Sequence, residues 1–374
     1  MPLSELIQLR KSLHRQPEIA FEEWNTAARI SEFFHPLSPD HIISQLGGTG
    51  LAFVFKRKKP GPRTLFRCEL DALPILEKSE VKYKSQMEGK GHLCGHDGHI
   101  AIICGLGEKL AANRPESGEV VLLFQPAEET GQGARAILND PKFELIRPDY
   151  AFALHNLPGF PLHQVVLRNG TFAAGSTGVT IKLTGKTAHA AHPEDGINPA
   201  SAIAHLIQVL PKLPEKLKNF ALVTIIHAEL GSLAFGTSAG RGSLSVTVRA
   251  FDQSDLENLI NRIKAEAKGI AILEKLTCEF ELLETFAVSK NDPKAGQLVE
   301  KVLEDLDLSW IEKSDPFRWS EDFGLFSQQC PSYLFGLGAG ETCSQLHEPT
   351  YDFPDELIET GVRIFEGIVR RVNG

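Results

Sequence analysis

Cysteine, basic charge and long apolar runs are scarce in this 374-residue chain, and each scarcity excludes a class of protein. The six cysteines are dispersed without the spacing of a disulfide framework, so we expect reduced thiols. The formal net charge of −9 argues against a nucleic-acid partner, which would favour a basic face. No apolar run reaches about 18 residues, so no membrane span is expected. The first residues lack the basic-then-apolar pattern of a signal peptide, which predicts a cytoplasmic location.

A glycine-rich stretch, residues 91–99, concentrates potential metal ligands. Its thiol, imidazole and carboxylate side chains belong to His92, Cys94, His96, Asp97 and His99. Thiolate and imidazole suit zinc and its neighbours, and the glycines let the backbone turn tightly enough to aim several side chains at one point. By itself, the stretch leaves open a scattered metal site, a structural zinc knot and a solvated histidine-rich loop.

Ligand-type side chains also follow three apolar runs that are typical of buried strands. The runs are 120–123, 150–154 and 64–67, and the residues that follow them are Glu128 and Glu129, His155, and Glu69 and Asp71. In open α/β sheets, ligands bind beyond the carboxyl ends of the strands. Of two adjacent glutamates at such an end, one can bind a metal ion while the other acts as a general acid or base. The alternative for a Glu-Glu pair is a solvated loop, and for His155 a core histidine.

The order of apolar patterns predicts two domains, as the length also favours. From residue 1 to about 175, strand-like runs alternate with helical patterns, and the same alternation resumes after about 284. This predicts an α/β domain with a mostly parallel sheet covered by helices. Between them, residues 176–283 show strands of period two and two helices, which predicts a smaller inserted α+β domain with one exposed sheet face.

Six ordered segments carry a family resemblance across nearly the whole chain. They are ELDALPI at 69–75, CGHDGH at 94–99, QPAEE at 125–129, GKTAHAA at 185–191, SEDF at 320–323 and HEPTYDF at 347–353. On these motifs, the chain resembles the metal-dependent aminoacylase and carboxypeptidase family. Within it, the chain is similar to the amidohydrolase branch, which includes hippurate hydrolases, N-acyl-amino-acid amidohydrolases and auxin-conjugate hydrolases. The resemblance implies a catalytic domain of residues 1–175 and 284–374 and an inserted lid domain that dimerises, giving a homodimer.

The resemblance also implies the residues of the metal site. Two divalent ions, manganese or zinc and otherwise cobalt or nickel, are expected on five ligands: Cys94, His96, Glu129, His155 and His347. A Cys94 thiolate could bridge the two ions, because sulfur has more than one usable lone pair. Glu128 is the expected general base, since a carboxylate beside a metal site can take a proton from water and return it to a leaving amine. Glu69 and Asp71 are expected to orient the ligands.

Two residues of the inserted domain are expected to contact substrate. By resemblance, His189 reaches the substrate carbonyl oxygen in the partner subunit's site, and Arg249 binds a substrate carboxylate. The family has an asparagine 13 positions before that arginine, whereas this chain has Gly236. For His189 and Arg249 the alternative is an ordinary surface residue.

These residues predict hydrolysis of a linear amide, best an N-acyl amino acid, which would be the small-molecule partner of this chain. A dipeptidase or carboxypeptidase with the same metal site and a catalytically silent metal-binding relative are the alternatives. A cysteine hydrolase using Cys94 and His96 would not account for Glu128 and Glu129, and chelation would spare it.

Overall fold

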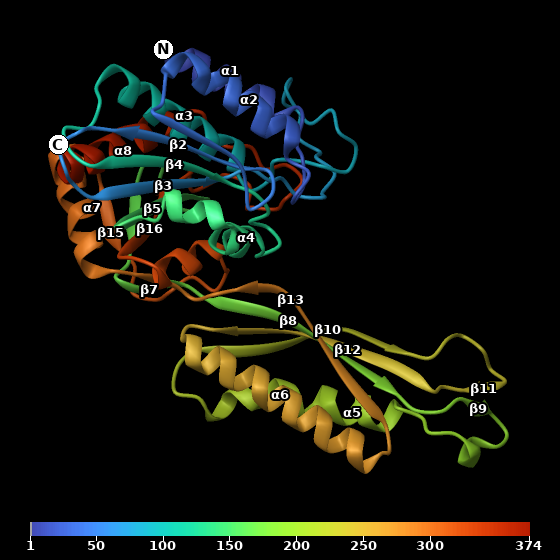
Figure 1. Ribbon diagram of the computed structural model, residues 1–374. Helices are drawn as coiled ribbons and strands as arrows, with labels where there is room; N and C mark the ends of the chain where they lie inside the picture. The colour runs from blue at the N-terminus through green and yellow to red at the C-terminus, as the bar shows by residue number, and fades with distance from the viewer. Residues whose placement is uncertain (1) are drawn as a thin grey trace. The chain divides into compact units, whose positions relative to one another are not determined.

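The computed structural model describes residues 2–374 and divides the chain into two compact units. The larger unit contains the residues up to Phe172 together with Ser289–Pro316 and Asp322–Gly374. The inserted unit contains Ala173–Val288 and Phe317–Glu321. Each unit has a hydrophobic core of its own. The chain therefore leaves the larger unit at Ala173, builds a second core and returns at Ser289, and residues 317–321 belong to the inserted unit again (Figure 1).

An eight-stranded sheet, in the order β1-β2-β4-β3-β5-β16-β6-β15, forms the centre of the larger unit. Its strands are β1 His41–Leu46, β2 Gly50–Lys56, β3 Arg63–Glu69, β4 Glu119–Gln125, β5 Tyr150–Leu157, β6 Val165–Leu167, β15 Trp310–Glu312 and β16 Ser332–Gly338. The central strands β4, β3, β5 and β16 are parallel to one another, while β1, β2 and β6 add antiparallel pairs. The α/β class predicted from the sequence is confirmed, with a mixed sheet that is parallel at its centre.

Six α-helices cover this sheet. They are α1 Leu3–His14, α2 Trp24–Phe34, α3 His96–Ala112, α4 Gly133–Asn139, α7 Pro293–Asp305 and α8 Leu357–Asn373. One face of the sheet packs against α3 and α8 around fully buried aromatic rings, among them Phe66 and Phe152. The short helix α4 and the 3-10 helix η5 Asp322–Gln328 lie over the opposite face (Figure 1). The side chain of Arg67 contacts Asp322, the first residue of η5. This two-sided cover explains why the central strands read as continuous apolar runs.

The inserted unit is an α+β layer pair, the second part of the predicted fold class. Its four-stranded antiparallel sheet runs β10-β12-β8-β13. Its elements are β8 Gly175–Thr184, β9 Ala188–His189, α5 Ala200–Val209, β10 Ala221–Leu230, β11 Thr237–Ser238, β12 Arg241–Ala250, α6 Gln253–Leu273 and β13 Thr277–Phe286. Along β8, Val179, Ile181 and Leu183 are buried against the helices, and the residues between them face outward. The alternation of buried and outward-facing residues along the strand is therefore what a sheet covered on one face produces.

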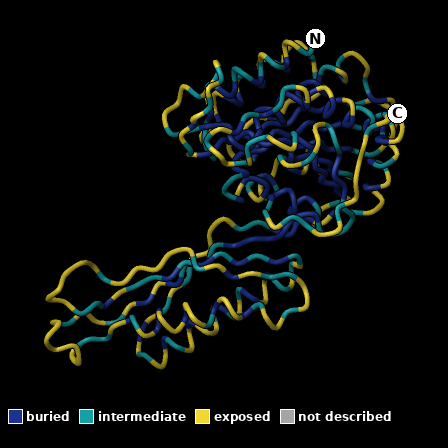
Figure 2. The backbone as a smooth tube through the Cα atoms, turned by 180° about the vertical axis from the view of Figure 1, so that it is seen from behind, coloured by how far each residue is buried: buried dark blue, intermediate teal, exposed yellow. Residues whose placement is uncertain are grey.

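The remaining elements are short. A two-stranded sheet joins β7 Gly170–Ala173 to β14 Ser289–Asn291, and four more 3-10 helices are η1 His35–Leu37, η2 Pro141–Leu145, η3 Pro193–Asp195 and η4 Leu210–Lys216. Exposed residues lie on helix surfaces, at loop tips and along strands β10 and β13 of the inserted unit, while the central strands of the larger unit are buried (Figure 2). Within residues 2–374, no helix combines the length and the apolar character that a membrane span requires.

Candidate active site

The carboxyl ends of β3, β4 and β5 bring the predicted ligands of the larger unit together. Parallel neighbours end at one edge of the sheet, so the residues in and just beyond the last part of these strands share a small space. Ligand atoms within 4.8 Å of one another form five groups in the described residues, and three of them contain the predicted ligands and base alone: Cys94, His96 and His155; Cys94, Glu129 and His347; and His96, Glu128 and Glu129. All five predicted ligands and the predicted base therefore meet in one place, and Cys94 belongs to two groups.

Helix α3 begins directly at the ligands. His96 is its first residue, and Gly95 before it adopts a left-handed backbone with φ 91°. A Cβ atom at Gly95 would lie 2.5 Å from Oδ1 of the buried Asn156, so only glycine fits this close approach. The apolar pattern of residues 100–112 predicts a helix that begins at residue 100, whereas in the structure α3 begins four residues earlier. His96, Asp97 and His99 thus lie in the first helical turn, where a fixed backbone orients them.

Two histidine rings have their tautomers set by backbone carbonyls. His96 Nδ1 donates to the carbonyl of Asp71 at 2.8 Å, and His155 Nδ1 donates to the carbonyl of Asn156 at 2.9 Å. In each neutral ring, the lone pair is then on Nε2. His155 Nε2 lies 3.6 Å from Cys94 Sγ. Burial lowers the pKa of His96 to about 3, which keeps this ring neutral and able to bind a metal.

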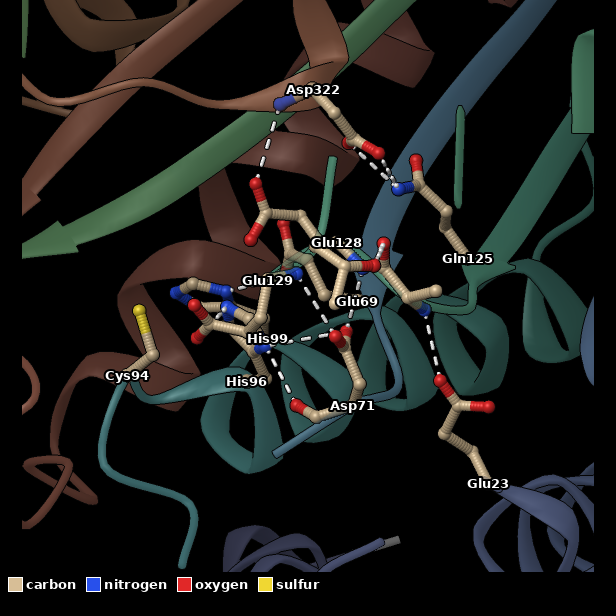
Figure 3. Close-up of polar contacts among 12 residues, drawn as sticks. Glu23, Glu69, Asp71, Cys94, His96, His99, Gln125, Glu128, Glu129 and Asp322 are labelled. Atoms are coloured by element: carbon tan, nitrogen blue, oxygen red, sulfur yellow. Dashed lines mark hydrogen bonds and ion pairs between the residues drawn. The ribbon is translucent and has the colours of Figure 1, made fainter. Parts of the chain in front are cut away.

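The turn after β4 presents Glu128 and Glu129 (Figure 3). The buried carboxylate of Asp71 accepts both of their backbone N–H groups, at 3.0 Å each. On the side chain of Glu128, Oε1 accepts the backbone N–H of Asp322 at 3.3 Å. Glu128 is 5% exposed. Asp71 therefore fixes the backbone of the turn, and a second contact holds the carboxylate of Glu128.

Glu69 lies behind the site and contacts a second histidine. It accepts from His99 Nδ1 at 2.7 Å, while His99 Nε2 accepts the backbone N–H of Asn156 at 3.3 Å. Burial alone would raise the pKa of Glu69, but the adjacent guanidinium of Arg67 holds it well below the usual range. Both ring nitrogens of His99 are thus engaged, and His99 helps to fix strand β5 beside α3.

The electrostatics of the site fit divalent cations. Burial, followed by the charges of Glu129 and Glu128, raises the pKa of the Cys94 thiol well above its usual value. Buried His96 Nε2 forms no hydrogen bond within residues 2–374, and the nearest carboxylate oxygen, on Glu129, is 3.9 Å away. The thiol of Cys94, the carboxylates and the unbonded Nε2 of His96 together are a set of donors that suits zinc or manganese. A bound cation would also favour the thiolate form of Cys94. The residues present therefore fit a pair of metal ions.

His347 reaches the group from a distant part of the chain. Its Nε2 lies 3.6 Å from Glu129 Oε2, and its backbone N–H donates to the carbonyl of Leu93 at 2.8 Å. The residue has a positive φ of 68°, and its side chain is half exposed. Its backbone is thus held next to Cys94, while its ring keeps access to solvent.

A buried ion network lies beneath these loops. Arg10 of α1, which is fully buried, donates to Asp97 at 2.9 Å and to Asp355 at 3.1 Å, and it also contacts Asp352. His14 donates to the same Asp97 carboxylate at 2.9 Å. The network ties α1 to the start of α3 and to the segment that follows His347. Sequence reasoning missed it, because its members come from three separate segments.

A second missed set lies on the opposite face of the sheet. Arg67 is fully buried and donates to Gln125 at 2.9 Å and to Asp322 at 2.6 Å, and Gln125 donates to both oxygens of Asp322. The signal that could have found it is a charged residue inside the apolar run 64–67, because a buried charge requires a partner. The sequence does not reveal that the partner, Asp322, is 255 positions away.

The two predicted substrate contacts belong to the inserted unit. His189 is exposed on β9, which pairs with β11, and its Nδ1 accepts the backbone N–H of Ala191 at 3.0 Å. Arg249 at the end of β12 donates through Nη1 to the carbonyl of Arg318 at 3.1 Å and to Ser320 Oγ at 2.9 Å. A side chain at Gly236 would meet no atom within 4 Å, so packing within this unit does not impose glycine there.

Comparisons with known proteins agree with this geometry. A family model described as peptidase family M20/M25/M40 matches residues 65–371. An N-acetyldiaminopimelate deacetylase of Exiguobacterium sibiricum is 30% identical over 368 residues, covering 97% of this chain and 98% of that protein. The corresponding deacetylase of Oceanobacillus iheyensis is 29% identical and covers 96% of both chains. The structure of YXEP from Bacillus subtilis, described as a dinuclear metal binding peptidase, has a TM-score of 0.84 at 25% identity and covers 98% of this chain and 97% of its own.

Proposed function

Because the chain belongs to peptidase family M20/M25/M40 and is a metal-dependent amidohydrolase, we propose that its substrates are N-acyl amino acids. Two divalent ions would be held by Cys94, His96, Glu129, His155 and His347. The observation that carries this proposal is the neutral tautomer of His96, whose Nε2 faces a group of thiol and carboxylate ligands. The dinuclear YXEP relative supports the number of ions. Manganese and zinc both suit these donors.

The residues around the ions would each have one task. When bound, the ions would supply a Lewis acid for the scissile carbonyl and lower the pKa of the attacking water. Glu128 takes a proton from that water and delivers it to the leaving amine nitrogen. Its position depends on Asp71, which holds the turn, and on the N–H of Asp322. Glu69 acts through His99 and keeps β5, with His155, beside α3.

The inserted unit would recognise the substrate. The Nδ1 contact of His189 leaves Nε2–H as the donor of the neutral ring, which suits a carbonyl oxygen that gains negative charge. We propose that this donor serves the partner's site in a homodimer formed through the inserted domain, residues 176–283. In Arg249, Nη2 and Nε donate to no acceptor in the described part of the chain, while Nη1 is anchored. That pair of donors suits a bidentate carboxylate, the free acid group of an N-acyl amino acid.

The substrate class is tested with a panel of N-acetyl and N-benzoyl amino acids and dipeptides, each assayed with added manganese, zinc or cobalt. We expect the N-acyl amino acids to be the best substrates and chelation to abolish the activity. Glu128→Gln should keep both ions and lose about a hundredfold to ten-thousandfold in kcat. A preference for dipeptides would favour a dipeptidase. Activity that survives chelation would refute the metal site, and near-normal turnover of a fully metallated Glu128→Gln variant would refute the base.

A further inference from the structure

Three consecutive backbone N–H groups at the site are each bound by a buried carboxylate. Asp71 accepts from Glu128 and Glu129, as described above, and Glu23 accepts from Ala127 at 2.9 Å (Figure 3). Ala127 has a positive φ of 50°, which disfavours any residue with a Cβ atom. The residue that immediately precedes the proposed base is therefore strained, and Glu23 holds its N–H group.

Glu23 is itself fixed from several sides. Its side chain is 0% exposed, and its second oxygen accepts from Thr49 Oγ1 at 2.5 Å. Five residues earlier, Glu18 accepts the backbone N–H of Thr26 at 2.8 Å, and its carbonyl accepts the N–H of Ala72, the residue after Asp71, at 2.8 Å. The segment from Glu18 to Glu23 thus contacts the backbone beyond β3 and the backbone beyond β4.

The carboxylate of Glu23 is costly for stability. Within residues 2–374 it forms no ion pair with lysine or arginine, and burial raises its pKa. A buried carboxylate without a cation destabilises a fold unless its hydrogen bonds offset the desolvation. Two of its hydrogen bonds come from distant residues, one from the side chain of Thr49 and one from the backbone of Ala127 in the strained turn. The second contact connects this residue to the chemistry.

We propose that Glu23 is a positioning residue for amide hydrolysis, which holds Ala127 in its left-handed conformation and thereby aims Glu128 and Glu129. The proposal rests on the proposed function, because Glu128 and Glu129 are its base and one of its metal ligands. Glu23 acts only through the turn, so its loss should lower kcat and the affinity for metal more than it raises KM. A purely structural role, as an anchor of α2, would change stability alone.

The test compares Glu23→Ala, Glu23→Gln and Thr49→Val. Glu23→Ala should lose about tenfold to a hundredfold in kcat, the range expected when reacting groups are misplaced by about 1 Å. Glu23→Gln keeps an acceptor for Ala127 and should recover most of that loss. Thr49→Val removes the other hydrogen bond of Glu23 and is the matched control: its melting temperature should fall, and its kcat should stay at the wild-type value.

A double variant separates positioning from anchoring. Glycine adopts a positive φ without the Cβ penalty, so Ala127→Gly should restore part of the kcat that Glu23→Ala loses. Manganese affinity, measured by calorimetry, should follow the same order as kcat across the four variants. Equal kcat in Glu23→Ala and Thr49→Val at equal melting temperature, or no rescue by Ala127→Gly, would overturn the proposal. If the wild type hydrolyses no amide, the proposed function fails, and manganese affinity alone then decides the role of Glu23.

Discussion

Replacement of Asp71 by asparagine should separate the energetics of the fold from those of the site. The two oxygens of Asp71 accept one backbone N–H group each, from Glu128 and Glu129. In Asp71→Asn, the amide nitrogen must face one of these donors, so one bond is lost and one buried N–H is left without an acceptor. Hydrogen bonds to charged groups contribute about 1.5–3 kcal/mol, and an unsatisfied buried donor costs about 1–3 kcal/mol.

An opposing effect reduces this loss in the metal-free protein. Burial, followed by the charges of Glu129 and Glu23, raises the pKa of Asp71 well above its usual value, so the ionised form is disfavoured there. Removing the charge relieves that repulsion. Bound cations would cancel the repulsion in the wild type, so the variant should differ most when metal is present. We therefore expect a small change in the metal-free melting temperature, but a loss of about tenfold to a hundredfold in metal affinity and activity.

The assay for Asp71→Asn combines manganese calorimetry, kcat and KM on an N-acyl amino acid, and thermal unfolding with and without metal. Asp292→Asn is the matched control, because Asp292 also accepts two backbone N–H groups, from Lys294 and Ala295 at the start of α7. Both N–H groups bond the same oxygen, Oδ1, which asparagine keeps, and asparagine caps a helix about as well as aspartate, so this variant should keep nearly wild-type stability and unchanged metal affinity. The reasoning is wrong if Asp71→Asn binds two ions with wild-type affinity, or if it loses as much stability without metal as with it.

Three further predictions concern the ligands and the assembly. Gly95→Ala should destabilise the fold by about 2 kcal/mol or more, measured by chemical denaturation, because the new Cβ would clash with Asn156 at a positive φ; unchanged stability would contradict the close approach. Cys94→Ser should lower metal occupancy in elemental analysis, since a hydroxyl replaces a thiolate poorly; two ions at full affinity would exclude a bridging sulfur. Mixing Glu128→Gln with His189→Ala chains should restore about one site in four, because half of the dimers are hybrid and each has one intact site; hybrids without activity would show that His189 does not act across the interface.

The sequence predicted which side chains lie together at the candidate metal site, because ligand chemistry depends on residue type. The apolar runs 64–67, 120–123 and 150–154 marked the central strands, and parallel strands bring their carboxyl ends to one edge. It follows that the carboxylate and imidazole groups at the ends of those runs lie close together, while Cys94, His96 and His347 come to the same place from other segments. Element ends were less predictable: β5 continues to Leu157, so His155 lies inside the strand rather than after it. A histidine at that point interrupts the apolar pattern although the backbone pairing with β16 continues.

The start of α3 shows a different limit of the sequence. Residues 96–99 contain two histidines, an aspartate and a glycine, which give no apolar periodicity, so the pattern indicated a loop. The helix nevertheless includes them, because Gly95 turns the backbone and Asp97 is held by Arg10 and His14. Tertiary contacts thus decide a helix start that local propensity leaves open.

The residues that hold the ligands in place are harder to recognise in the sequence than the ligands themselves. Glu23 and Asp71 accept hydrogen bonds from backbone N–H groups. Almost every residue has such a group, so the sequence does not show which one a given carboxylate will bind. Arg67 and Asp322 form a recognisable charge pair, but their separation along the chain hides it. We expect metal affinity to depend on the ligands and on the residues that hold them in place, because a ligand contributes fully only when its orientation is already fixed. A related chain could therefore keep all five ligands and lose activity through a change at Glu23 or Asp71, whereas exchange of an exposed residue next to a ligand would matter little.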